Sequence, residues 1–321
     1  MAMDGRHMLR EAGPACGMVI AVALVIGLCA AGPAGAQAGV VSAAASSICQ
    51  SARHPALAAR LSGGIVSALR GRSSAVGLTA DDRVSGVTCK LHPHWHIDSA
   101  SVVKVTILSA LLRKLQQERR SLTAQQKYLA TQMITVSDNN AASALWAQTG
   151  RPSLQRFLNL AGMQETQLGP GGYWGLTQIT AHDELTLLSL LTSRNSVLSA
   201  ASCGYVLNLM AHVIPSERWG VPAGAPADVT VHVKNGWLLQ PTHAWRINSI
   251  GSFSGHGRDY MIVVLTWNNP TMTYGIDTVQ AVAEVINRDL NPGVTAVIPP
   301  SAPYPSWGRP DEQIPALPGR S

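Results

Sequence analysis

Three short motifs in this 321-residue chain combine side chains that could carry out nucleophilic chemistry. Ser101 and Lys104 form an S-x-x-K pattern, and residues three apart on a helix share a face, which places the amine beside the hydroxyl. A serine hydroxyl is a weak nucleophile until a base takes its proton, and a desolvated lysine can be that base. At a helix start, backbone N–H groups would also face a developing oxyanion.

The second motif is Ser137-Asp138-Asn139, at an expected break between helices. A hydroxyl there could relay a proton from the lysine to a leaving nitrogen, and the amide could hold a substrate carbonyl. The same residues are also typical of a helix N-cap. This motif alone therefore does not distinguish a catalytic role from a helix cap, and only its combination with the other two motifs favours catalysis.

The third motif is Lys234-Asn235-Gly236, which closes an alternating strand. The lysine could supply positive charge, and the glycine could let a substrate backbone approach closely. A polar strand end with a turn glycine would look the same. Only five of the 24 basic residues are lysines, and two of the five fall in these motifs.

The elements that must position these side chains follow from hydrophobic periodicity. Strands precede and follow a long helical region, which indicates one antiparallel sheet closed by the two ends of the chain, with a helical insertion. Asp98 or Ser99 is expected to cap the helix that carries Ser101, and Thr180 to Asp183 resemble a capping box. The expected helices are 55–69, 101–119, 181–192 and 275–290, and the expected strands are 74–79, 84–91, 229–233, 244–253 and 259–267.

The motifs occur in an order that resembles the penicillin-recognising serine hydrolases, meaning class A β-lactamases and the related D-Ala-D-Ala peptidases. The resemblance covers residues 54–290, and the stretch 133–142 is especially similar. It implies an α/β fold of the α+β type, with a five-stranded antiparallel sheet (54–99 and 216–290) and an all-helical subdomain (100–215).

The resemblance also implies roles for individual residues. Ser101 would be the acylated nucleophile, Lys104 its proton acceptor and Ser137 the proton relay. Asn139 would position the acyl side chain, and Lys234 would support the site electrostatically. The substrate-binding residues would be Asn235, Gly236, Trp237 and Arg246. The backbone N–H groups of Trp237 and Ser101 would form the oxyanion hole. The Arg246 side chain could equally face outward.

Three departures from the family pattern bear on activity. Asn235 stands where the family usually has Thr or Ser, and the segment between Ser101 and Ser137 is compact. The loop 168–174 lacks the glutamate that activates the deacylating water in class A enzymes; Glu165 and Asp183 flank the loop without matching that motif. We therefore expect acylation to be possible and hydrolysis of the acyl-enzyme to be slow.

The N-terminus has the layout of a secretory signal peptide. An apolar run from Met18 to Ala31 is too short for a membrane span, and Ala34-Gly35-Ala36 resembles a cleavage site. We expect a signal peptide at 1–36, with an uncleaved anchor as the alternative, then a linker at 37–53 and a Pro-rich disordered tail at 291–321. The protein is expected to be secreted and monomeric, with no stable membrane span after processing.

The remaining polar clusters suggest no cofactor. Cys49 and Cys89 are the expected disulfide pair, and Cys203 an apolar filler in a helix. His92, His94 and His96 alternate, but no acidic or cysteine ligand accompanies them, so no metal is expected. Trp174, Trp237 and Trp245 could line the cleft, although core packing is expected of at least one.

Composition narrows the class of partner. Hydrophobic residues make 46% of the chain, which excludes global disorder, and the scattered positive charge excludes a nucleic-acid footprint. The sequence thus predicts an exported serine hydrolase that is acylated at Ser101 by a β-lactam or a D-Ala-D-Ala-type cell-wall peptide. The alternatives are a D,D-peptidase or esterase with slow β-lactam turnover, and a weakly catalytic penicillin- or peptidoglycan-binding protein.

Overall fold

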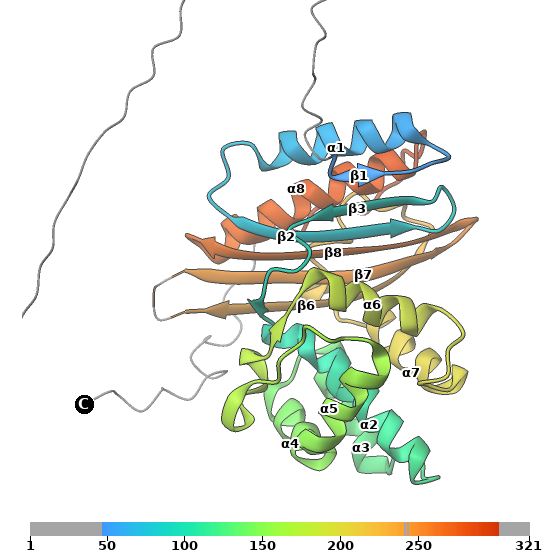
Figure 1. The fold of residues 1–321 in the computed structure, drawn as a ribbon, viewed down its shortest axis with the longest axis vertical. Coiled ribbons are helices and arrows are strands. Elements are labelled where there is room, and N and C mark those ends of the chain that lie inside the picture. The colour runs from blue at the N-terminus through green and yellow to red at the C-terminus, as the bar shows by residue number, and fades with distance from the viewer. Residues whose placement is uncertain (1–46, 241, 243, 302–321) are drawn as a thin grey trace, which may run out of the picture. The chain divides into compact units, whose positions relative to one another are not determined.

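The computed structural model describes residues 47–301 except 241 and 243, and it is built around one antiparallel sheet (Figure 1). The expected five long strands are present, and a short sixth strand extends one edge. Its residues fall in the stretch expected as a linker. In spatial order the strands are β1 (Cys49–Gln50), β3 (Val87–Leu91), β2 (Ala75–Asp82), β8 (Arg258–Asn269), β7 (Trp245–Gly255) and β6 (Thr230–Leu239).

Alternating side chains on the central strand β8 face two separate cores. Ile262 and Val264 belong to a cluster formed with helices α1 (Pro55–Leu69) and α8 (Met272–Leu290), which lie together on one face of the sheet in Figure 1. Met261 and Val263 belong to a second cluster, formed with the helical part of the chain. This period-two pattern is what a strand buried on both faces requires.

The helical part is arranged around α2 (Val103–Gln117), in which 11 of 15 residues are buried. Its apolar residues pack against neighbouring helices of this part. The other elements are α3 (Ala124–Thr135), α4 (Asn139–Thr149), α5 (Arg151–Ala161), α6 (Ala181–Thr192), α7 (Ala200–Ala211), the short helices η1 (Ala100–Val102), η2 (Pro170–Gly172), η3 (Trp174–Leu176) and η4 (Pro215–Glu217), and a small sheet of β4 (Ile97–Asp98) and β5 (Gln178–Ile179).

Of the two expected helix caps, the one at Thr180 is confirmed, although Asp183 does not complete the capping box. The Thr180 hydroxyl accepts a hydrogen bond from the N–H of Asp183 at the start of α6. The cap expected from Asp98 or Ser99 is wrong, because η1 precedes α2 and neither side chain caps it. The Asp98 carboxylate is instead engaged by Arg246, and the Ser99 hydroxyl donates to backbone carbonyls.

The first part of the expected C-terminal tail is folded onto the domain. Ile298 donates a backbone hydrogen bond to Ala225, and Gly224 donates one to Ile298. Disorder from residue 291 onward is therefore wrong for 291–301, and residues 302–321 lie outside the described part of the chain.

The predicted signal peptide, its alternative as an anchor, and the first ten residues of the linker also lie outside the described residues. Within the part of the chain that the structure does describe, none of the helices has the length and apolarity that a bilayer crossing needs.

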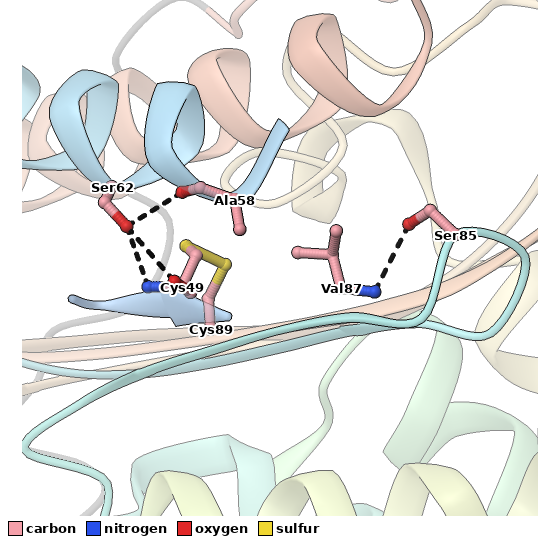
Figure 2. The surroundings of a disulfide bond; sticks show 6 residues. All are labelled: Cys49, Ala58, Ser62, Ser85, Val87 and Cys89. Atoms are coloured by element: carbon pink, nitrogen blue, oxygen red, sulfur yellow. Dashed lines mark hydrogen bonds between the residues drawn. A yellow bond between two sulfur atoms is a disulfide. The ribbon is translucent and has the colours of Figure 1, made fainter. Parts of the chain in front are cut away.

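The predicted disulfide between Cys49 and Cys89 is confirmed, and it fixes the short strand β1 to β3 (Figure 2). Ser62 on α1 accepts a hydrogen bond from the N–H of Cys49 and donates one to the carbonyl of Ala58. The hydrogen bond between Cys49 and Ser62 thus joins the disulfide-linked sheet edge to α1. Cys203 is free and buried in α7, as expected of an apolar filler.

We expect reduction of this disulfide to lower the free energy of unfolding by roughly 2–4 kcal/mol, because the bond closes a long loop in the unfolded chain. The two cysteines are 40 residues apart. The measurement is urea denaturation with and without a reductant. A Cys203→Ala variant is the control and should show the same loss on reduction, because its disulfide is intact. Equal stability of the oxidised and reduced proteins would contradict the expectation.

Candidate active site

Ser101 lies in η1, directly before α2, and its side chain is fully buried. Within residues 47–301, as far as they are described, its hydroxyl oxygen has no hydrogen-bond partner. The preceding residue, Ala100, has a φ of +47°, a left-handed conformation that is strained for a residue with a Cβ. Strained backbone next to an unpartnered buried hydroxyl is typical of a site that performs chemistry.

Lys104 shares the helix start with Ser101, but its amine is directed at the second motif. Nζ donates to the carbonyl of Ser137 at 2.5 Å, to Oδ1 of Asn139 at 2.8 Å and to Oγ of Ser137 at 3.2 Å. These three oxygens match the three donors of an ammonium group. The sequence predicted the amine beside the serine hydroxyl, and in this conformation no Lys104–Ser101 hydrogen bond is present.

The sequence left open whether the second motif caps a helix or supplies a functional hydroxyl, and in the structure Asp138 does the first while Ser137 is placed for the second. Asp138 is the N-cap of α4 and accepts a hydrogen bond from the N–H of Ala141. Ser137 has a φ of +58°, and this turn directs its hydroxyl into the site instead of along the helix. The cap and the functional hydroxyl are therefore neighbouring residues.

Lys234 completes the cluster from the sheet. Its Nζ donates to Oγ of Ser137 at 2.9 Å and to the carbonyl of Asn235 at 2.9 Å. The Ser137 hydroxyl thus lies between two lysine amines, both fully buried. The structure therefore brings together Lys104, Ser137, Asn139 and Lys234 next to Ser101.

Gly236 explains how β6 reaches the serine. A Cβ at this position would lie 2.8 Å from the backbone nitrogen of Ser101 and 2.8 Å from the carbonyl oxygen of Ser99. Such contacts are too short, so only glycine allows this approach. The sequence predicted a close approach of a substrate, whereas the close neighbour here is the chain's own helix start.

Burial controls the charges of this cluster. It lowers the pKa of Lys104 well below the usual lysine range, and the positive charge of Lys234 adds to this effect. Burial also lowers the pKa of Lys234, to about 8, and the Glu217 carboxylate opposes that shift. Burial raises the pKa of Glu217, against the effect of the two lysines.

Trp174, in η3, covers one side of the Lys104 amine. The centre of its indole ring lies 4.8 Å from Nζ, and the side chain is 4% exposed. The indole N–H donates to Oγ of Ser143 on α4, which holds the ring in place. The loop that carries Trp174, residues 168–177, contains no carboxylate.

The other two tryptophans belong to a core. Trp237 is buried in the cluster shared with α1 and α8, where its ring lies 6.1 Å from that of Trp219. Trp245 packs against the same cluster. Of the three tryptophans singled out in the sequence, Trp174 therefore contacts the site and the other two contribute to packing.

Two predicted substrate-binding side chains are engaged within the protein. The amide nitrogen of Asn235 donates to the carbonyls of Glu217 at 2.7 Å and Trp219 at 2.8 Å. Arg246 forms an ion pair with Asp98, with 3.3 Å between Nε and Oδ2. Sequence reasoning missed Glu217 and gave Asp98 only a capping role, because neither lies in a motif.

The carboxylates that flank the loop have other partners. Asp183 accepts hydrogen bonds from the backbone N–H groups of Glu165 and Thr166. Glu165 accepts one from Thr180 and pairs with the ring of His94. Both therefore fix the loop ends.

The three alternating histidines are not on a strand. His92 stacks on Trp95, and the rings of His94 and His96 contact the side chain and the carbonyl of Glu165. Among the described residues, no group of three His, Cys, Asp or Glu side chains could hold a metal ion.

Comparisons with known proteins point to one family. The sequence profile of the Beta-lactamase enzyme family matches residues 123–290, which is just over half of the chain and includes the second and third motifs. A Mycobacterium bovis protein named "Putative lipoprotein LppW" is 26% identical over 175 residues. This match covers 52% of the chain and 55% of LppW, so the chain spans about half the length of the curated relatives it matches.

Solved structures share the fold. A class A beta-lactamase from Bacteroides cellulosilyticus is 17% identical, with a TM-score of 0.64 over 72% of this chain and 97% of its own. One from Mycobacterium abscessus is 21% identical, with a TM-score of 0.61 over 71% and 98%. The L158E mutant of PBP-A, in an acyl-enzyme complex with penicillin G, is 18% identical, with a TM-score of 0.62 over 72% and 96%.

Proposed function

This chain belongs to the beta-lactamase enzyme family, and we propose that it is an exported serine hydrolase that is acylated at Ser101 by a β-lactam or a cell-wall peptide amide. The observation that carries the proposal is the cluster of two buried lysine amines around the Ser137 hydroxyl, next to a buried serine hydroxyl without a partner. Burial and the charge of Lys234 disfavour a second positive charge in this cluster, which favours the neutral form of Lys104.

In the proposed acylation, the Ser101 oxygen attacks the carbonyl carbon while its proton passes to the neutral amine of Lys104. The lowered pKa of Lys104 favours that neutral form. When the carbon–nitrogen bond breaks, the proton passes through the Ser137 hydroxyl to the leaving nitrogen. Asn139 holds the acyl side chain, and the N–H groups of Ser101 and Trp237 stabilise the oxyanion.

The proposed product is an acyl-enzyme that hydrolyses slowly. Hydrolysis needs a water molecule and a base on the loop side of Lys104. That side is covered by the Trp174 ring, and residues 168–177 carry no carboxylate. These features favour a D,D-peptidase or esterase over an efficient β-lactamase, and a weakly catalytic penicillin-binding protein is the further alternative.

Export is supported by the disulfide, because such bonds persist in oxidising compartments. The relatives named as lipoproteins agree with a location at the cell envelope or outside the cell.

The test is to incubate the protein with benzylpenicillin and follow the intact mass over time. We expect a 1:1 adduct that maps to Ser101, is absent in Ser101→Ala and persists long after free penicillin is removed. Without a Ser101-dependent adduct the acylation proposal fails. Rapid release of the adduct would show that the loop side of Lys104 supports hydrolysis after all.

The rate of acylation should show a bell-shaped dependence on pH. It should rise as Lys104 loses its proton, which happens well below the usual lysine range. It should fall above about pH 8, where Lys234 loses its charge. Adduct formation measured from pH 5 to 10 tests this shape.

Lys234→Arg separates the two limbs of that profile. Arginine keeps its charge throughout this range, so the falling limb should move beyond pH 10 or so while the rising limb stays in place. A falling limb that stays near pH 8 in this variant would contradict the assignment to Lys234.

A further inference from the structure

The Asn235 side chain has no donor left for a substrate carboxylate. A carboxamide nitrogen has two N–H groups, and here they donate to the carbonyls of Glu217 and Trp219. Both partners are carbonyl oxygens, which fixes the orientation of the amide. The remaining polar atom, Oδ1, is a buried acceptor that would repel an anion.

The Arg246 guanidinium already holds a carboxylate of the protein. Its Nε contacts Oδ2 of Asp98, and the two side chains are only 19% and 14% exposed. Gln178 and Gln240 each donate to Asp98 at 2.5 Å and keep it in place. Withdrawing Arg246 toward a substrate would leave a partly buried carboxylate without its counter-charge, which is costly. The Nη1 atom of Arg246 is buried and has no partner among the residues that the structure describes.

Among the described residues, Lys234 is the remaining cation considered at this end of the site, and it too has partners. Its amine is fully buried and donates to Ser137 and to the carbonyl of Asn235. The Glu217 carboxylate acts on it electrostatically. The protein therefore supplies its own acidic groups to the two cations that could select an anionic substrate.

From these contacts we propose that the site acts on an internal amide or an ester, uncharged on the leaving-group side, and does not select substrates by a terminal carboxylate. This inference rests on the proposed acylation of Ser101 and narrows its substrate class: of the alternatives above, it favours an esterase over a D,D-peptidase that acts at a terminal D-Ala. A substrate carboxylate placed here would lose hydration without gaining a free cation, and that cost would slow acylation.

The test compares benzylpenicillin with its methyl ester, which share the acyl group and differ in the carboxylate. The rates of Ser101 adduct formation are measured by intact mass on the wild-type protein. We expect the ester to react at least as fast as the acid. A more than tenfold advantage of the acid would overturn the inference and leave the acylation proposal standing. If neither compound forms an adduct, the proposed function fails, and the inference fails with it.

Asp98→Asn provides a second measurement. This near-isosteric change releases Arg246 from its ion pair, so the ratio of acid to ester rates should rise about tenfold, as expected for one charge-assisted contact. Asp259→Asn is the control, since it breaks an ion pair with Arg83 that no site residue shares, and its ratio should equal that of the wild type. An unchanged ratio in folded Asp98→Asn would overturn the role given to Arg246.

Discussion

Replacing Lys104 with arginine should lower the rate of acylation by about 10³-fold, within the range that general-base catalysis contributes. Arginine keeps the positive charge and can donate hydrogen bonds, but it does not give up its proton near neutral pH. Burial and the nearby Lys234 lower the pKa of Lys104, so a neutral amine is accessible there. The variant therefore removes proton transfer and makes the positive charge at this position permanent. The measurement is the second-order rate constant for adduct formation with benzylpenicillin.

Lys114→Arg is the matched control, because Lys114 lies on the same helix and only donates hydrogen bonds. Its Nζ contacts the carbonyls of Gln148 and Thr149. Arginine can make such bonds, so adduct formation should stay at the wild-type rate. If folded Lys104→Arg retained more than a tenth of the wild-type rate, Lys104 would not be the proton acceptor.

Spacing along the chain predicted which motif residues lie together, because each motif places its residues by local geometry. Ser101 and Lys104 share a helix start, and Lys234 and Gly236 lie on one strand, as expected. What the spacing could not predict is which partner each side chain takes. Lys104 donates to three oxygens around Ser137 and Asn139, and those oxygens arrive from a segment more than 30 residues away.

The partners of the residues expected to bind substrate were harder to predict, since these contacts depend on long-range packing. Arg246 and its partner Asp98 are 148 residues apart, and nothing local to either residue indicates the ion pair. Asn235 stands where the family has a hydroxyl residue, and its longer amide reaches two carbonyls of the 217–219 segment. The structure therefore places both side chains, expected to bind substrate, in contacts inside the protein.

Hydrophobic periodicity predicted the long helices and strands, but it did not predict the short strand β1 or the ordered segment 291–301. Strand β1 has only two residues, too few to show alternation, and it is held to the sheet by a disulfide and by pairing with β3. Residues 291–301 have the composition of a disordered tail, but three backbone hydrogen bonds to the segment 224–227 order them. Composition reports average tendencies and does not register such pairing.

Gly236→Ala should reduce the rate of acylation by about 10²-fold, the cost expected when reacting groups are misplaced by around 1 Å. The added Cβ would lie 2.8 Å from the Ser101 nitrogen and 2.9 Å from the Val102 nitrogen. These are backbone atoms that cannot rotate away, so β6 and η1 must separate. That separation shifts the serine from Lys234 and moves the two proposed oxyanion-hole donors, the N–H groups of Ser101 and Trp237, apart. Overpacking of this kind also lowers the free energy of unfolding by about 1–3 kcal/mol.

Gly204→Ala is the control for the same change of side chain at an open position. A Cβ at Gly204 meets no atom within 4 Å, and the residue lies inside α7, where alanine is favoured over glycine by about 1 kcal/mol. This variant should keep wild-type acylation and unfold at a slightly higher urea concentration. Gly236→Ala should instead combine slow adduct formation with lower stability. If Gly236→Ala were acylated at the wild-type rate, the close contact between β6 and η1 would not be what positions the nucleophile.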